Sequence, residues 1–265
     1  MSRVLTENIS QSTESDPSSV NIHKLPVWLT VCVLAVVGIL FGAYRLYLNK
    51  YAFSVGLDYF EPEFQQYWMT LFYIQIPVMT VFGIAALSWL WFTRDSVVEM
   101  TPQQELGIYM KILAFLLAFG VAFGVIFALF VEADAAWHQV TIRDTDFTPT
   151  HILLFYFLIP VMIIALATGF MWLHTRMPDF RDRISLPFGI VVAGVALILP
   201  NVGFNEWGHT FFYAEELFAA PIHWGFVTLG WAFFAIAGVL IQILDRLRLL
   251  TGVIDEQKKA TLDSP

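Results

Sequence analysis

Charged residues and cysteine are both scarce in this chain of 265 residues, and each scarcity excludes a class of protein. Only 14% of the residues are charged, whereas soluble domains carry about 25%. Cys32 is the only cysteine, which excludes a disulfide framework and a thiolate metal cluster. The net charge of −8 argues against a nucleic-acid partner, because nucleic acids are bound by basic faces. With 58% hydrophobic residues and a mean hydropathy of +0.68, the composition indicates an integral membrane protein.

Six apolar runs approach or exceed the roughly 20 residues that a helix needs to cross the hydrocarbon core. They are Leu25–Leu48, Tyr67–Phe92, Ile108–Val131, Ile152–Leu173, Leu186–Phe204 and Pro221–Leu244. The first run is too long for a cleavable signal peptide and lacks a small-residue cleavage site. The sequence therefore predicts an all-α polytopic membrane protein with about six transmembrane helices. We expect a polar N-terminal tail at 1–24, a helical membrane domain at 25–245 and a C-terminal tail at 246–265.

Basic residues are distributed unevenly between the two sides of this topology. Eleven of the fourteen lie on the side that holds both termini, and only Arg45, Lys50 and Arg143 lie on the other. Because Lys and Arg accumulate on the cytoplasmic side, we predict cytoplasmic termini. In a bacterial inner membrane, the opposite side of the protein would face the periplasm.

Two polar stretches lie on that outer side, and they share one layout. Each has an Asp or Asn four residues before a histidine, followed by a second histidine two residues after a proline. The residues are Asp134, His138 and His151 in the first stretch, and Asn205, His209 and His223 in the second. Residues four apart share a helical face, provided for the second pair that the helix continues through Gly208. Proline favours the first helical position, so we expect His151 and His223 in the opening turns of their helices.

These side chains predict two metal sites, because ionisable groups at membrane depth cost roughly 2.5–3.5 kcal/mol and are usually paired or metal-bound. One carboxylate with two imidazoles suits iron, zinc or copper, whereas an amide with two imidazoles suits copper. Residue types alone leave the metal open, and interhelical hydrogen bonding is the alternative. The flanking acids would orient the imidazoles or form a solvated face. They are Glu132, Asp144, Asp146, Glu206, Glu215 and Glu216.

Other interpretations of the histidines belong to different classes of protein. A proton- or ion-coupled transporter would use Asp134, Glu206 and the histidines as a relay, and a di-haem electron carrier would use the histidines as axial ligands. Transporter sites lie near the bilayer midplane, whereas these residues lie at the ends of spans. Asp146 or Thr148 is expected to cap the helix that Pro149 opens. His23 and His174 are expected to be ordinary interfacial residues.

Five motifs link the chain to a known family. They are WHQVTIRDTDFTPTH at 137–151, LPNVGFNEWGHTFFYAEELFAAPIHWGF at 199–226, GLDYFEPEFQQYWM at 56–69, WFTRD at 91–95 and TRMPDF at 175–180. In these motifs the sequence resembles the C subunit of the copper membrane monooxygenases, the family of particulate methane monooxygenase, ammonia monooxygenase and short-alkane monooxygenases. The resemblance extends from about residue 45 to 245 and leaves both tails outside it.

The resemblance implies a chain that is active only with the A and B subunits, in a trimer of heterotrimers within membrane lipid. The complex would insert one oxygen atom of O2 into a small substrate, namely methane, ammonia or a short alkane, with quinol as electron donor. The family's Asp-His-His copper site matches Asp134, His138 and His151. Its Asn-His-His copper site matches Asn205, His209 and His223.

Three departures from the family pattern leave these six residues unchanged. Ala133 replaces a Gln, Phe204 replaces a Leu, and Phe212-Tyr213 replaces a Trp-Phe pair. The last two lie near the second expected site. They leave the substrate open, with a short alkane as one candidate.

Overall fold

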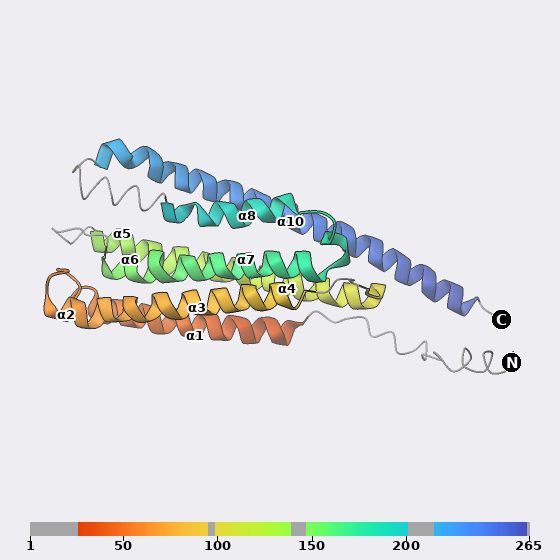
Figure 1. Ribbon diagram of the computed structural model, residues 1–265, viewed down its shortest axis with the longest axis horizontal. Coiled ribbons are helices and arrows are strands. Elements are labelled where there is room, and N and C mark those ends of the chain that lie inside the picture. Colours follow the sequence, from red (N-terminus) through yellow and green to blue (C-terminus); the bar gives the residue numbers. More distant parts are fainter. Residues whose placement is uncertain (1–25, 95–98, 139–146, 201–214, 264–265) are drawn as a thin grey trace.

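The computed structural model describes residues 26–94, 99–138, 147–200 and 215–263, and these ranges form helices joined by turns and loops, without any strand. Side chains are described in these ranges except at 138, 215–229, 233 and 258. The helices lie side by side in an elongated bundle (Figure 1). The predicted all-α class is confirmed.

The elements follow the predicted order. They are α1 (Val27–Tyr51), α2 (Pro62–Phe64), η2 (Gln65–Met69), α3 (Thr70–Phe92), α4 (Pro102–Ile126), η3 (Phe127–Val131), α5 (Glu132–His138), α6 (Pro149–Leu153), η4 (Leu154–Leu158), α7 (Ile159–Arg176), η5 (Pro178–Phe180), α8 (Leu186–Ala196) and α10 (Glu215–Leu262). The segments η2, η3 and η4 are π-helices that join their neighbours into continuous helices.

Among the described residues, four continuous helices are long and apolar enough to cross a membrane. They are Val27–Tyr51, Pro62–Phe92, Pro102–Trp137 and Pro149–Arg176. A shorter apolar helix at Leu186–Pro200 corresponds to the fifth predicted run, and α10 contains the sixth. The helices extend beyond the apolar runs because local signals set their ends. For example, Thr101 forms a reciprocal capping box with Gln104 at the start of α4.

One predicted helix start is wrong. We expected Pro221 to open the last helix and to place His223 in its first turn, but α10 begins at Glu215. Glu215 and Glu216 are negative charges suited to a helix N-terminus, and membrane helices tolerate an internal proline. At its other end α10 continues to Leu262, so the predicted C-terminal tail begins within this helix.

The bundle has two ends that differ in what they hold. The site end is where α2, α5, α6 and the start of α10 lie, and the far end is where α4 begins and α7 ends (Figure 1). Helix α10 packs along α8, where Gly238 approaches Pro187, and α3 packs against α7. Only 6% of the apolar window of α1 is buried within the chain, so this helix offers most of its apolar surface to its surroundings. Trp68 is fully buried.

Polar contacts fasten the far end. The Glu105 carboxylate accepts hydrogen bonds from Arg246 Nε at 2.8 Å and from Nη2 at 3.0 Å, which ties α4 to α10. His174 Nε2 accepts from the backbone N–H of Ser185 at 3.0 Å, while Nδ1 lies 2.7 Å from the Phe170 carbonyl oxygen. Nδ1 must then carry the proton. His174 therefore has an ordinary structural role.

Candidate metal centre

Asp134 and His151 meet at the site end of the bundle. Asp134 lies in α5, and His151 lies in the first turn of α6, where Pro149 opens the helix as predicted. Asp134 Oδ1 is 3.4 Å from His151 Nε2, and the two side chains are 17% and 4% exposed. The structure thus brings two of the three residues of the first predicted set into contact.

The orientation of His151 is fixed by its helix cap and by its packing. Thr148 Oγ1 accepts a hydrogen bond from the backbone N–H of His151 at 3.0 Å, which confirms Thr148 as the predicted cap. The Thr148 and Thr150 hydroxyls are 3.1 Å apart, and both residues are buried. The imidazole lies edge-on to Phe155, with 5.2 Å between ring centroids. These contacts hold the imidazole ring of His151 in place.

A π-helix lies beside each member of the pair. The segment η3 ends three residues before Asp134, and η4 begins three residues after His151. A π turn accommodates one residue more than an α turn and is frequent at functional sites. Each added residue turns the rest of the helix by about 100°, so these segments determine which way the two side chains face.

Helix α1 and the loop after it contact the helix that carries Asp134. Arg45 Nη1 donates to the Leu129 carbonyl in η3, and Nη2 lies 3.4 Å from Glu132 Oε2. Trp137 Nε1 donates to the Ala52 carbonyl at 3.2 Å. Sequence reasoning missed the roles of Arg45 and Trp137. The available signal for Arg45 was a cation within an apolar run on the outer side.

Gly56 is expected to be intolerant of a side chain. A Cβ there would lie 2.5 Å from Pro149 Cγ and 2.6 Å from the Ala52 carbonyl oxygen. Gly56→Ala would therefore displace the start of α6 and destabilise the protein by about 1–3 kcal/mol, as overpacking usually does. The measurement is the melting temperature of the purified complex.

Gly38→Ala is the matched control, because nothing lies within 4 Å of a Cβ at this position in α1. Alanine favours the helix interior by about 1 kcal/mol over glycine, so this variant should melt at the same temperature or slightly higher. Equal melting temperatures for the Gly56 variant and the wild type would contradict the packing argument.

Aromatic rings surround Phe147, the residue before the cap. Phe147 stacks on Tyr59 and Tyr156 with centroid distances of 5.8 and 5.7 Å, and Phe72 meets it edge-on at 5.3 Å. This cluster joins the loop after α1, the start of α3 and the π-helix η4. It makes the surroundings of the Thr148 cap predominantly apolar.

The other predicted ligands fall partly or wholly outside the described residues. His138 lies one helical turn after Asp134 in α5, and His223 lies in α10, but neither side chain is described. Asn205 and His209 lie in the range 201–214, outside the description. Over the part of the chain whose side chains are described, no group of three His, Cys, Asp or Glu residues is arranged to hold a metal. The largely buried carboxylate of Asp134 and the buried imidazole of His151 nevertheless fit a transition-metal site in donor type.

A family model for the C subunit of ammonia monooxygenase/methane monooxygenase matches residues 9–254. The chain belongs to this family. The match to the C-subunit family includes both polar stretches, and it extends further into the two tails than the resemblance at 45–245 had indicated. A search of curated proteins finds no match.

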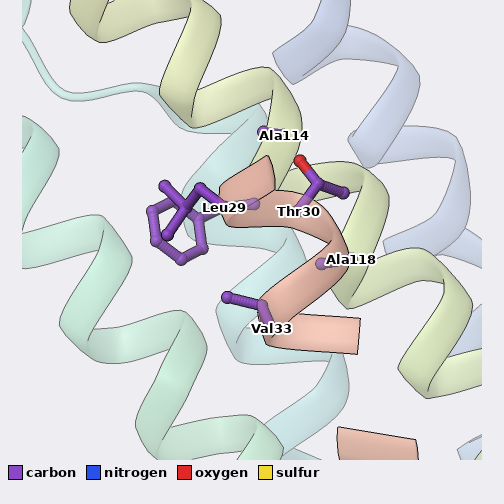
Figure 2. A pocket seen from close by; sticks show the side chains of 6 residues that line it. Leu29, Thr30, Val33, Ala114 and Ala118 are labelled. Carbon is purple, nitrogen blue, oxygen red and sulfur yellow. The ribbon is translucent and has the colours of Figure 1, made fainter. Parts of the chain in front are cut away.

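A hollow elsewhere in this monooxygenase subunit is separate from Asp134 and His151. It is a shallow hollow between α1 and α4, lined by Leu29, Thr30, Val33, Ala114, Phe115 and Ala118 (Figure 2). Leu29 and Val33 lie in the first two turns of α1, whereas Arg45, which supports η3, lies near its other end. The lining contains no ionisable side chain, so the hollow offers no ligand to a metal.

Proposed function

We propose that this chain is the C subunit of a copper-dependent membrane monooxygenase that oxidises methane, ammonia or a short alkane with O2. The observation that best supports the proposal is the contact between Asp134 and His151. A carboxylate and an imidazole lie 3.4 Å apart and largely buried at the site end, where unpaired ionisable groups are costly. Family membership favours this function over a transporter or an electron carrier.

Asp134, His138 and His151 would hold one copper ion. When bound, copper supplies the redox chemistry with O2 that protein side chains lack. The chain's own part is to orient the donors. The helical spacing of four residues sets Asp134 and His138 on one face of α5, and the Thr148 cap fixes His151. The aromatic cluster around Phe147 limits access of water from the α2 side.

Asn205, His209 and His223 would hold a second copper ion. Support comes from the family resemblance and from the position of α10, which begins at the same end of the bundle as α5 and α6 (Figure 1). We assign electron supply to a quinol. The substrate would be small and apolar, in keeping with a site surrounded by apolar helices.

We further propose that the chain works only with the A and B subunits, as a trimer of heterotrimers in a bacterial inner membrane. The site end would face the periplasm, with both termini cytoplasmic. The apolar surface left open on α1 is suited to lipid and to partner helices. In this arrangement the polar contacts of Glu105 and Arg246 lie at the cytoplasmic boundary.

Copper content and oxidation measured on the same samples test the proposal. The purified complex would be compared with His138→Ala and His209→Ala, each assayed with methane, ammonia and butane. Each substitution is expected to remove about one copper per copy of this chain and abolish oxidation while the subunits remain associated, since metal affinity depends on every ligand. The preferred substrate of the wild type would identify the branch of the family. A wild-type complex with no copper attributable to this chain would contradict both site assignments.

A further inference from the structure

Arg45 connects α1 to the π-helix that precedes Asp134. Its guanidinium donates from Nη1 to the Leu129 carbonyl, which lies within η3, and from Nη2 to Glu132, the first residue of α5. The Arg45 side chain is 26% exposed. One side chain therefore bridges the segment in which the helical ladder changes from π back to α.

The contact with the Leu129 carbonyl is the more important of the two. Exposed ion pairs contribute about 0–1 kcal/mol, and the Glu132 side chain is 63% exposed. A π turn disturbs the regular backbone ladder, where an inserted side chain can bind a carbonyl group. Hydrogen bonds from a charged donor contribute about 1.5–3 kcal/mol. Arg45 is thus placed to stabilise the π conformation rather than an ordinary α turn.

Loss of the π turn would change the direction in which Asp134 points. If Phe127–Val131 became α-helical, every following residue would rotate by about 100° about the helix axis relative to α4. Asp134 would then leave the face that meets His151. We propose that Arg45 is a positioning residue that holds η3 in its π form and so keeps Asp134 facing His151. What this pair binds rests on the proposed function, whereas its alignment by Arg45 does not.

Deleting one residue from the π-helix provides a specific test. Ala128 is exposed within η3, and its removal converts the π turn into an α turn while leaving Asp134 on its original face. Arg45 should then no longer be needed to keep Asp134 facing His151. If Arg45 only held α1 against α4, removing Ala128 would not compensate for the loss of Arg45.

The readout is cross-linking between two introduced cysteines, Asp134→Cys and His151→Cys. The full-length chain would also carry Cys32→Ser, and it would be studied within the membrane complex. A short bis-methanethiosulfonate reagent reports the proximity of the two positions without any metal. Arg45→Ala is expected to lower the yield at least about fivefold because of the rotation. Deletion of Ala128 should restore the yield in the presence of Arg45→Ala, and Glu132→Gln should leave it unchanged.

An unchanged yield with Arg45→Ala, or no recovery on deleting Ala128, would overturn the inference. If Arg45→Ala alone does not accumulate, recovery of its accumulation by the deletion is the expected result, and failure to recover overturns the inference. Copper content of the same variants with Asp134 and His151 intact separates the two proposals. If cross-linking responds to the variants as expected but the complex contains no copper, the proposed function is refuted and the positioning role of Arg45 stands. If the complex contains normal copper but the cross-linking yield does not depend on Arg45, the positioning role is refuted and the proposed function stands.

Discussion

Replacing His151 with alanine is expected to remove about one copper per copy of this chain and to reduce oxidation more than about 100-fold. Even groups that merely orient metal ligands usually cost 10–100-fold when removed, and His151 is proposed as a ligand itself. Its imidazole is 4% exposed beside Asp134, whose side chain is 17% exposed, so alanine would also leave a largely buried carboxylate without this neighbour. The measurement combines copper content, turnover and native electrophoresis of the complex.

His174→Asn is the matched control for this substitution. His174 is the other histidine with a described side chain, and it lies at the far end between the Phe170 carbonyl and the Ser185 amide. This variant should melt at a lower temperature but retain its copper. If both variants lost copper equally, general destabilisation would explain the loss, and the assignment of His151 as a ligand would fail.

Replacing Glu105 with alanine is expected to destabilise the protein by about 2 kcal/mol. Removing one partner of a buried ion pair costs about 3–5 kcal/mol, and the 30% exposure of the Arg246 side chain reduces this cost through solvation. Arg246 would lose a carboxylate that accepts two of its hydrogen bonds, at 2.8 and 3.0 Å. Thermal unfolding of the complex in detergent measures the effect.

Two further variants separate loss of the ion pair from loss of packing. Glu105→Met combined with Arg246→Met should recover much of the stability, because apolar replacement of a whole buried pair is often neutral. Arg248→Ala, two residues away on α10, removes an exposed cation that lies 3.6 Å from Asp245. It should change stability by less than about 1 kcal/mol. Equal effects of Glu105→Ala and Arg248→Ala would contradict the argument.

The fold class and one half of the first site were predictable because they depend on short-range patterns. Apolar runs of membrane length predicted the helices, and their order was confirmed. Pro149 with Thr148 before it predicted the start of α6, and hence the place of His151. The spacing of Asp134 and His138 correctly predicted a shared helix, α5.

Long-range contacts could not be predicted in the same way. Arg45 meets Leu129 from 84 residues away, and Glu105 meets Arg246 from 141 residues away. No local pattern specifies such partners. The π-helices also escaped prediction, because an added residue leaves no regular periodicity in an apolar run. The predicted start of α10 was wrong because Pro221 and the acidic pair Glu215-Glu216 are both suited to a helix N-terminus, and the helix begins at the acidic pair.

Helix α10 is much longer than a membrane requires. At 1.5 Å per residue, its 48 residues extend about 72 Å, more than twice the roughly 30 Å hydrocarbon core. The part of α10 after Arg246 extends about 24 Å beyond that residue, away from the site end. Because the helix is long, a tilt of about 5° about Glu215 would displace its C-terminal end by about 6 Å. A fluorophore attached at Thr261, near the end of α10, would report small tilts of the helix that carries His223.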